Sequence, residues 1–260
     1  MRIHERPEFL LTCRYIDRYI KPGDRVLDIG GGPGRYSIYL AEKGCDVTLF
    51  DLSEGNLEFA LAKAEEHNVS LKALRGDARC ADELLRDEQF DHIPLMGPLY
   101  HLLEESDRIR AVEAALNLLR PGGVIFVSFI ALFAGIIYYM KIAPEAIISQ
   151  DPVDINICKC VLNEKNYCGD LFTRVFLIEQ NNILPFMAQF PLKKLHLISQ
   201  EGILSPCESN IFSASPEARA AWLDLAESLC ERQDFLSWAE HLMYIGRGGC
   251  GNAKDALEAF

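Results

Sequence analysis

Short apolar runs alternate with amphipathic stretches along the first half of the chain. Most of the runs are rich in aliphatic and β-branched residues, and their lengths are typical of buried strands rather than of helices. They predict strands at residues 25–30, 45–51, 70–77, 90–97 and 123–129. Because most of these runs lack a regular polar alternation, other elements should cover both faces of the sheet that they form.

The segments between these strands have helical character. They predict helices at residues 35–43, 54–67 and around 82–86. Ser53 is a suitable N-cap for the second of these helices. Ser106 could cap a fourth helix, which Pro121-Gly122 should end. Its apolar residues recur at helical spacing, namely Ile109, Val112, Leu116 and Leu119.

Strands that alternate with helices are joined by right-handed crossovers, which makes them parallel members of one sheet. Two further strand-like runs, at residues 192–198 and 241–246, bring the expected sheet to seven strands. The sequence therefore predicts an α/β fold with a doubly wound, mostly parallel seven-stranded sheet. In such sheets, ligands bind beyond the carboxyl ends of the strands, where the strand order reverses.

The alternation of strands and helices breaks after residue 130, although we expect the whole chain, residues 1–260, to form one domain. We expect a helical N-terminal segment, a core, an insertion that acts as a lid over the substrate, a region with the remaining strands and a helix from Ser215-Pro216, and a frayed tail. These parts correspond to residues 1–23, 24–130, 131–190, 191–247 and 248–260. The insertion is apolar and helix-like, with an extended stretch at residues 171–178.

The apolar stretch at residues 124–140 approaches the roughly 20 residues that cross a bilayer. It follows Pro121-Gly122-Gly123 and begins with β-branched residues, which favours a buried strand followed by an apolar helix. Residues 1–10 contain no apolar core of signal-peptide length. We therefore expect no membrane partner and a cytoplasmic location.

Composition narrows the choice of partner further. The net charge of −12 argues against a nucleic acid partner, because binding to phosphates depends on Lys and Arg. The nine cysteines include no CxxC pair and are expected to be reduced thiols. Cys158, Cys160 and Cys168 form the tightest group, but their spacing differs from that of zinc sites, so no metal is predicted.

A glycine-rich turn follows the first predicted strand, in the stretch VLDIGGGPGRY at residues 26–36. Glycines let the backbone approach a ligand closely, and the following helix offers free N–H groups to an anion. The Gly-Lys-Ser/Thr of a P-loop is missing. The third glycine of the dinucleotide fingerprint is missing too. Counted from Gly30 its position is Arg35, and counted from Gly32 it is Ser37.

Two acids at strand ends separate the remaining cofactors. Asp51 ends the second predicted strand, where its carboxylate could hold two ribose hydroxyls of either a dinucleotide or a nucleoside. Asp77 ends the third strand, in the stretch RGDAR, where it could accept a hydrogen bond from an adenine amino group. The backbone N–H of Ala78 could serve an adenine ring nitrogen. This second acid favours a nucleoside cofactor.

At this point the chain resembles the class I S-adenosylmethionine-dependent methyltransferases. The matching stretches are VLDIGGGPGRY, LFDLS, GDA, FDHIPLMGPLYHL and LLRPGG, in the order and spacing of that family. They lie within residues 24–130. The resemblance implies a Rossmann-like fold, S-adenosyl-L-methionine as cofactor, S-adenosyl-L-homocysteine as product, and in-line methyl transfer to a small-molecule acceptor.

The same resemblance implies roles for individual residues. Asp28 would shape the glycine turn, and Asp51 would bind the ribose hydroxyls. Asp77 and Ala78 would read the adenine edge, while Leu52 would pack on the adenine ring. The residues implied to lie near the methionine part of the cofactor are Gly30, Gly31, Gly32, Met96 and Gly97.

The sequence defines catalytic groups less sharply. Tyr100 and His101 lie just past the fourth predicted strand and are the candidate catalytic residues, as a pocket wall and as a base or orienting group. The aromatic residues and methionines of residues 133–140 and 171–187 suit a small, partly apolar acceptor. Helices at residues 131–140 and 222–238 could also form the face of a homodimer.

Two other functions stay open. An NAD(P)-dependent oxidoreductase would also use Asp51, although the missing third glycine and the GDA stretch oppose it. A non-catalytic protein that binds S-adenosylmethionine would carry the same motifs, because these motifs report cofactor binding rather than turnover. The sequence identifies neither the acceptor nor the atom that is methylated.

Overall fold

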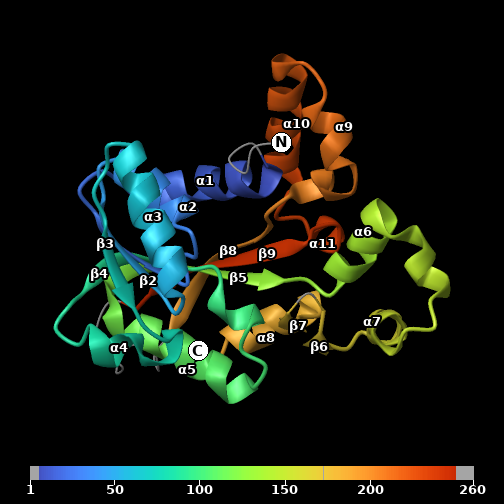
Figure 1. Cartoon of the computed structure of the whole chain (residues 1–260), viewed down its shortest axis with the longest axis horizontal. Helices are drawn as coiled ribbons and strands as arrows, with labels where there is room; N and C mark the ends of the chain where they lie inside the picture. Colours follow the sequence, from blue (N-terminus) through green and yellow to red (C-terminus); the bar gives the residue numbers. More distant parts are fainter. Residues whose placement is uncertain (1–5, 172, 250–260) are drawn as a thin grey trace.

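The computed structural model describes residues 6–171 and 173–249 of the 260-residue chain. Within this part, seven strands form one sheet in the order β3-β2-β1-β4-β5-β9-β8, and helices pack on both of its faces (Figure 1). The prediction of a doubly wound α/β fold with a mostly parallel seven-stranded sheet is therefore confirmed.

The first five strands are parallel neighbours. They are β1 (Arg25–Ile29), β2 (Asp46–Asp51), β3 (Lys72–Arg75), β4 (Phe90–Leu95) and β5 (Leu119–Ile130). The chain passes from β1 outward to β2 and β3, then returns to place β4 on the other side of β1. The strand order thus reverses between β1 and β4, which is where such folds form a ligand crevice.

Two antiparallel pairings complete the sheet. β9 (His241–Gly248) pairs with β5, and β8 (Leu192–Ser199) pairs with β9 at the edge. Both strands coincide with the late strand-like runs of the sequence. Because β9 runs against β5, its first residue, His241, pairs with Ile130 at the carboxyl end of β5. This brings the start of β9 to the edge of the sheet at which β1 to β5 end.

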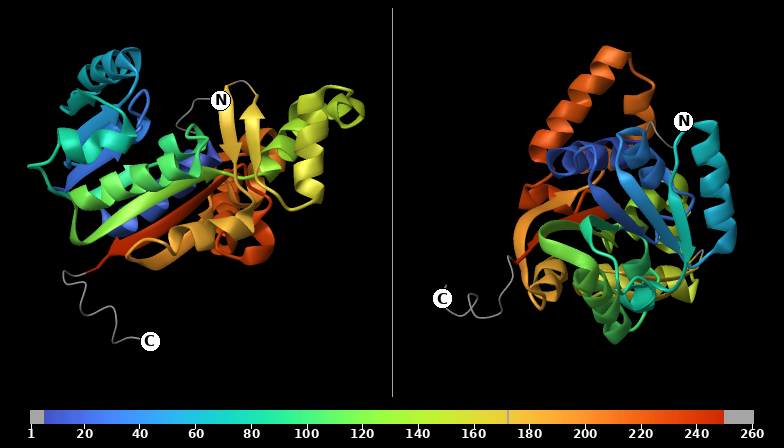
Figure 2. Two further views of the ribbon diagram at one scale, coloured as in Figure 1. Left: turned by 90° about the horizontal axis from the view of Figure 1, so that it is seen from below. Right: turned by 90° about the vertical axis from the view of Figure 1, so that its left-hand side faces the viewer.

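Alternate residues of each strand pack on opposite faces of the sheet, as the period of a strand requires. One face carries Leu27 and Ile125, and the other carries Val26 and Phe126. Helices on the first face are α4 (Ala81–Leu84), α5 (Glu105–Leu118), α8 (Ile183–Met187) and α11 (Gln233–Leu236). Helices on the second face are α1 (Pro7–Tyr19), α2 (Arg35–Glu42) and α3 (Glu54–Glu66), as Figure 2 illustrates.

The insertion after β5 leaves the sheet and returns to it. Its elements are α6 (Phe133–Ile142), α7 (Pro152–Leu162), β6 (Tyr167–Asp170), β7 (Arg174–Leu177) and α8, and α6 and α7 stand at the end of the molecule away from β3 (Figure 1). β6 and β7 form an antiparallel pair, and β7 covers residues 174–177 of the predicted extended stretch. A bridge between Ala131 and Ile178 ties the base of this insertion to the end of β5.

Short helical turns and two further helices connect the remaining elements. They are η2 (Ala78–Cys80), η3 (Pro98–Tyr100), η4 (Pro144–Ile148), η5 (Gln180–Asn182), η6 (Gly202–Cys207), α9 (Glu208–Phe212) and α10 (Pro216–Leu229). Ser53 and Ser215 cap α3 and α10 through bonds from the N–H groups of Asn56 and Ala218. These caps explain why both helices begin where the sequence places them.

The predicted helix before β5 is wrong in two details. Glu104, not Ser106, occupies the N-cap position of α5, and its side chain makes no capping bond. Leu119 belongs to β5 and pairs with Phe90, so Pro121 lies inside the strand rather than at the end of the helix. The register shifts between Phe90 and His92, and a proline without an N–H is tolerated at such an irregularity.

The ends of the chain are only partly described. β9 extends to Gly248, so the predicted tail begins inside a strand, and residues 250–260 lie outside the described residues. Residues 1–5 also lie outside the described residues. Within the predicted N-terminal helical segment, residues 7–19 form α1. Among the described residues, no helix is both long and apolar enough to cross a membrane. The same residues contain no metal-binding group of three or more His, Cys, Asp or Glu.

Candidate functional site

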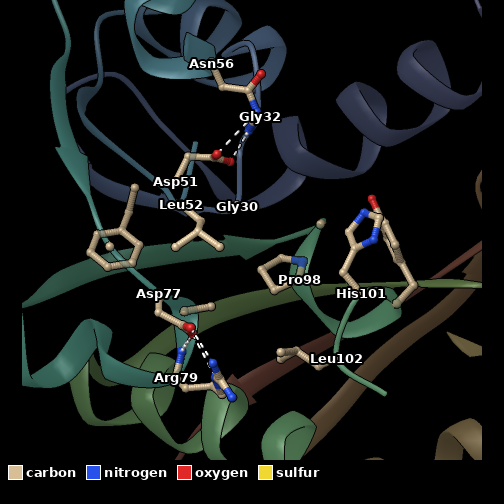
Figure 3. A pocket seen from close by; sticks show the side chains of 15 residues that line it. Gly30, Gly32, Asp51, Leu52, Asn56, Asp77, Arg79, Pro98, His101 and Leu102 are labelled. Carbon is tan, nitrogen blue, oxygen red and sulfur yellow. Dashed lines mark hydrogen bonds and ion pairs between the residues drawn. The ribbon is translucent and has the colours of Figure 1, made fainter. Parts of the chain in front are cut away.

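A pocket of about 450 Å³ lies at the carboxyl ends of the parallel strands (Figure 3). This volume is within the range of small-molecule sites. Four strand ends contribute to it: Gly30 and Gly32 follow β1, Asp51 and Leu52 end and follow β2, Asp77 and Ala78 follow β3, and Gly97 follows β4. Predicted site residues that are far apart in the sequence therefore lie in one cavity, at the point where the strand order reverses.

The glycine turn forms the wall of the pocket at the end of β1. Gly30, Gly32 and Gly34 have φ values of +69°, +56° and +80°, a region that residues with a Cβ rarely adopt. A Cβ on Gly30 would lie 2.5 Å from the side chain of Pro98. The turn therefore needs glycine both for its conformation and for its close packing against the segment after β4.

Asp28 lies beneath this turn and is only 1% exposed. Its carboxylate accepts a 2.6 Å hydrogen bond from Ser37 Oγ, and a Cβ on Gly31 would lie 2.4 Å from its Oδ2. Burial raises the pKa of Asp28 to about 6. The negative charge of Asp51 also contributes to this rise, whereas the hydrogen bond from Ser37 lowers the pKa. Asp28 and Gly31 thus support the turn from below and do not line the pocket.

Asp51 connects the turn to the end of β2. Its Oδ2 accepts the N–H of Gly32 at 2.9 Å, and its Oδ1 accepts the N–H of Ser53 at 2.9 Å and the side-chain amide of Asn56 at 3.3 Å. These bonds fill three of the roughly four acceptor positions of a carboxylate. A ribose diol needs two acceptor positions, so Asn56, which makes the longest bond, would have to turn away. Sequence reasoning missed Asn56, which no motif marks.

Asp77 is fixed by its neighbour Arg79. Its Oδ1 accepts hydrogen bonds from the backbone N–H of Arg79 at 2.9 Å and from the Nε–H of the same residue at 3.0 Å. Its Oδ2 accepts a hydrogen bond from another N–H of the Arg79 guanidinium at 2.6 Å. These bonds hold the pKa of Asp77 below its usual value, despite the opposing effect of burial. Arg79 also donates to Asp107 at 2.9 Å. The carboxylate is therefore ionised and oriented, with room for one more donor on Oδ2.

An apolar surface lies between the two acids. Leu52 is 64% exposed and projects into the space between Asp51 and Asp77 (Figure 3). Ala78 and Leu102 line the same pocket. A flat apolar ring of a ligand could pack on this side chain. Such packing is favourable because it removes exposed apolar surface from water. The pocket thus has polar ends and an apolar middle.

The end of β4 closes the pocket on the side of the glycine turn. A Cβ on Gly97 would lie 2.4 Å from the carbonyl oxygen of Gly30, so the two backbones touch here. Tyr100 donates a 3.0 Å hydrogen bond to the carbonyl oxygen of Met96. Burial raises the pKa of Tyr100 to about 12, so its hydroxyl stays protonated and serves as a wall rather than as a base. His101 is exposed, and its ring makes an edge contact with that of Tyr100, with 4.9 Å between ring centroids.

A second cavity of about 410 Å³ shares Tyr100 with the first and also reaches Met96. His101 lines only the first pocket, and Met96 lines only the second. The sequence suggested a partly apolar acceptor, but this cavity is lined mostly by charged side chains. They come from α1 and its N-cap, from α2, α6 and α9, from the segments before η6 and β9, and from the first residue of β9. They are Arg6, Glu8, Arg35, Lys141, Glu201, Glu208, Glu240 and His241.

Most of these charges are paired within the protein. Arg35 donates to both carboxylate oxygens of Glu8 at 2.9 and 2.7 Å, and the hydroxyl of Tyr36 donates to Glu8 as well. Lys141, in the predicted lid, donates to Glu240 at 2.8 Å and to Glu208 at 3.4 Å. The insertion is therefore tied to the rest of the chain across the second cavity.

The last pair joins the start of β9 to the segment after β8. Glu201 Oε1 lies 2.6 Å from Nδ1 of His241, while its Oε2 accepts the backbone N–H groups of Glu240 and His241 at 3.1 and 3.0 Å. Sequence reasoning missed both residues, because neither belongs to a recognisable motif. The available signal was weak: a histidine at the first position of the last predicted strand.

Comparison with known sequences agrees with this geometry. Residues 26–123 match a family profile described as a methyltransferase domain. The ubiquinone biosynthesis O-methyltransferase of Pseudomonas fluorescens (strain Pf0-1) is 33% identical over 144 residues, which are 52% of this chain and 60% of that protein. Over this region the chain is therefore similar to methyltransferases, in line with its resemblance to the class I S-adenosylmethionine-dependent family. The matched region spans less than two thirds of that curated relative.

Solved structures share the fold at low sequence identity. The 1,6-didemethyltoxoflavin-N1-methyltransferase of Burkholderia thailandensis gives a TM-score of 0.58 at 15% identity, covering 94% of this chain and 79% of that one. The 4+2 cyclase SpnF gives a TM-score of 0.59 at 16% identity, covering 94% of this chain and 82% of that one. Identities this low establish a common fold. They do not carry a reaction across, since function depends on the site.

Proposed function

We propose that this protein transfers the methyl group of S-adenosyl-L-methionine to a small-molecule acceptor and releases S-adenosyl-L-homocysteine. The observation that carries the proposal is the first pocket, in which a glycine turn, two acids and an apolar surface meet at four strand ends. The match of residues 26–123 to a methyltransferase domain supports it. So does the related Burkholderia thailandensis enzyme, which was crystallised with S-adenosylhomocysteine.

The residues of the first pocket fit each part of this cofactor. Asp51 would accept the ribose hydroxyls, and Leu52 would pack on the adenine ring. Asp77 and Ala78 would bind the adenine edge, through the acceptor position left on Oδ2 and through the backbone N–H. The backbone at Gly30, Gly32 and Gly97 would face the methionine part, as the family resemblance implies. Met96, for which the resemblance implies the same role, lines the second cavity instead.

When bound, the cofactor would supply a methyl group that is already activated by a positively charged sulfur. The task of the protein is then to orient the acceptor and to exclude water, which can contribute roughly 7–11 kcal/mol to catalysis. We assign the acceptor to the second cavity, because it meets the first at Tyr100. Residues 131–190 would act as its lid, with Lys141 fixing α6 in place.

A small acceptor suits the size of the second cavity, at about 410 Å³. Two similar proteins support this class, since one is an O-methyltransferase of ubiquinone biosynthesis and the other is a 1,6-didemethyltoxoflavin-N1-methyltransferase. The charged lining favours an acceptor with polar groups at the reacting end. This differs from the partly apolar acceptor that the sequence suggested.

Calorimetric titration tests the proposal against its alternatives. We expect S-adenosylmethionine and S-adenosylhomocysteine to bind one per chain, and NADH to give no heat of binding. Binding of NADH without a response to either S-adenosyl compound would favour an NAD(P)-dependent oxidoreductase instead.

The non-catalytic alternative needs a separate measurement, because the related fold of a cyclase warns that a methyltransferase fold can serve another reaction. We expect release of S-adenosylhomocysteine with at least one member of a panel of small hydroxyl, amine and thiol compounds. A protein that binds the cofactor tightly but turns over no compound of a broad panel would act as a binding protein.

A further inference from the structure

His241 is held in one orientation at the wall of the second cavity. A carboxylate can only accept hydrogen bonds, so the 2.6 Å contact with Glu201 places the proton of the imidazole on Nδ1. Two backbone N–H groups fix Glu201 in turn. The other ring nitrogen, Nε2, makes no hydrogen bond among residues 6–171 and 173–249, and the side chain is 35% exposed. This nitrogen is therefore available to a molecule in the cavity.

The other charges of the cavity explain what kind of group would meet Nε2. Each of the carboxylates of Glu8, Glu208 and Glu240 already has a cationic partner in Arg35 or Lys141. Glu201 pairs with His241, so every carboxylate among the described residues that line the cavity already has a partner. A neutral imidazole can accept a proton, and a charged one stabilises an oxyanion. Both forms suit an acceptor that reacts through oxygen.

We propose that His241 is the catalytic base for an acceptor with an ionisable hydroxyl group, such as a phenol or catechol, and that Glu201 is its positioning residue. The inference rests on the proposed function and names the substrate class of the same site. A base oriented by a third group is the arrangement that activates a weak nucleophile. Tyr100 and the exposed His101 do not offer this arrangement.

The proton and the electrons balance in a single displacement. The O–H bond of the acceptor breaks and its proton passes to Nε2 of His241. The oxygen forms the new O–CH₃ bond, while the C–S bond breaks and its electron pair stays on sulfur as S-adenosylhomocysteine. The imidazolium then returns its proton to solvent. No oxidant, reductant or metal is needed.

The surroundings of His241 predict an unusual pH dependence. Burial alone would lower its pKa, but the charge and hydrogen bond of Glu201 outweigh burial, and the charges of Glu8 and Glu240 add to them, so the pKa rises to about 9. The other charged or titratable groups that line the cavity are Arg6, Arg35, Tyr36, Tyr100, Lys141 and Glu208. The neutral form that accepts a proton should therefore be scarce near pH 7 and common above pH 9.

The test combines a rate profile with a direct titration of the imidazole. Catechol serves as the acceptor probe, and production of S-adenosylhomocysteine is followed from about pH 6 to 10 in the wild type, His241→Asn and Glu201→Gln. The wild-type rate should rise about tenfold per pH unit and level off near pH 9. His241→Asn should lose at least about 100-fold in rate. Glu201→Gln should move the inflection toward about 6.5, the ordinary pKa of histidine.

A control variant and an independent readout keep the result interpretable. His67→Asn removes a surface histidine that pairs with Glu42 and does not line the cavity. This variant should leave the pH profile of the rate unchanged. Nitrogen NMR should find that His241 titrates near 9 in the wild type and near its ordinary value in Glu201→Gln. Retained affinity for S-adenosylmethionine verifies that each variant is folded.

Failure of this inference differs from failure of the proposed function. A protein that does not bind S-adenosylmethionine contradicts the function itself. In a protein that binds the cofactor, three results would each show that the inference on His241 is wrong. The first is that catechol is not methylated, and the second is that His241→Asn has the wild-type rate. The third is that Glu201→Gln changes neither the pH of the inflection nor the pKa of His241 measured by NMR.

Discussion

Asp51 has two tasks, because one of its oxygens fixes the glycine turn and the other faces the pocket together with Asn56. Asp51→Ala should weaken binding of S-adenosylmethionine by about 1–3 kcal/mol, since a buried polar group would lose its partner. This corresponds to an increase of about 5- to 150-fold in Kd, measured by calorimetry. The protein should remain folded.

Asp46→Ala is the matched control for this prediction. Asp46 begins the same strand, is exposed, and lies at the opposite end of β2 from the pocket. It should leave the Kd of the cofactor unchanged. Equal affinity in Asp51→Ala and the wild type would remove Asp51 from the cofactor site.

Asp28 should make stability depend on pH in a recognisable way. Its pKa is raised from 3.8 to about 6 in the folded protein, so folding favours its protonated form. The stability from this group is complete below about pH 4 and is lost as the pH rises to about 6. A pKa shift of this size corresponds to about 3 kcal/mol.

Comparison with Asp28→Asn isolates that contribution from other carboxyl groups. The unfolding free energy of the wild type, measured with urea, should fall relative to that of Asp28→Asn between about pH 4 and 6. The difference should be constant above about pH 7. A difference that does not vary with pH would mean that Asp28 titrates normally in the fold.

At the residue scale, the sequence predicts pocket residues correctly when they lie at the end of a strand. Asp51 and Asp77 lie in the pocket because parallel strands end at one edge of the sheet. Arg79 and Asn56, which engage these acids, were missed because their positions depend on side-chain conformations. Glu201 and His241 were missed for another reason. They are 40 residues apart and meet because β8 pairs antiparallel with β9, which places the end of β8 beside the start of β9.

At the scale of elements, the site depends on how closely the glycine turn and the end of β4 approach each other. A Cβ on Gly97 would lie 2.4 Å from the carbonyl oxygen of Gly30, although φ at Gly97 is −140° and would permit alanine. Gly97→Ala should therefore act through this contact alone. It should destabilise the protein by about 1–3 kcal/mol, the usual effect of overpacking.

Gly97→Ala should also weaken the binding of S-adenosylmethionine, because the two backbones that face its methionine part must separate. Calorimetry and urea unfolding measure the two effects. Gly55→Ala is the matched control, since an added Cβ there meets no atom within 4 Å. It should leave both quantities close to their wild-type values. Wild-type affinity in Gly97→Ala would contradict the assignment of this contact to the cofactor site.

The elements themselves were largely predictable because local signals agree with the fold. The strands of the sheet coincide with the apolar runs, Ser53 caps α3 as expected, and α10 begins at the predicted Ser215-Pro216. The boundary between α5 and β5 was not predictable in the same way. Pro121 and Gly122 usually end a helix, but here the pairing of Leu119 with Phe90 begins the strand before them. Tertiary pairing overrides the local signal.

The whole molecule joins two different cavities at one edge of the sheet. The first is built from the core that the sequence motifs describe. The second shares some residues of that core, but most of its charged side chains come from α1, the insertion, α9 and the start of β9, which carry no motif. This division explains why the cofactor class could be predicted and the acceptor could not. The acceptor depends on side chains that only the complete fold brings together.

For the whole molecule, a homodimer stays a prediction. The aromatic side chains that suggested a shared face are about half exposed in the described chain, namely Tyr138, Trp222 and Trp238. Sedimentation of the purified protein would measure the oligomeric state directly.

The central claim is that one nucleoside lies across four strand ends, and a crystal structure with S-adenosylhomocysteine tests it most directly. We expect the ribose hydroxyls at Asp51, the adenine between Leu52 and Ala78 with its edge at Asp77, and the homocysteine part beside Gly30 and Gly97. The sulfur should face the second cavity past Tyr100. A compound bound elsewhere, or crystals grown in its presence with nothing in this pocket, would contradict the account.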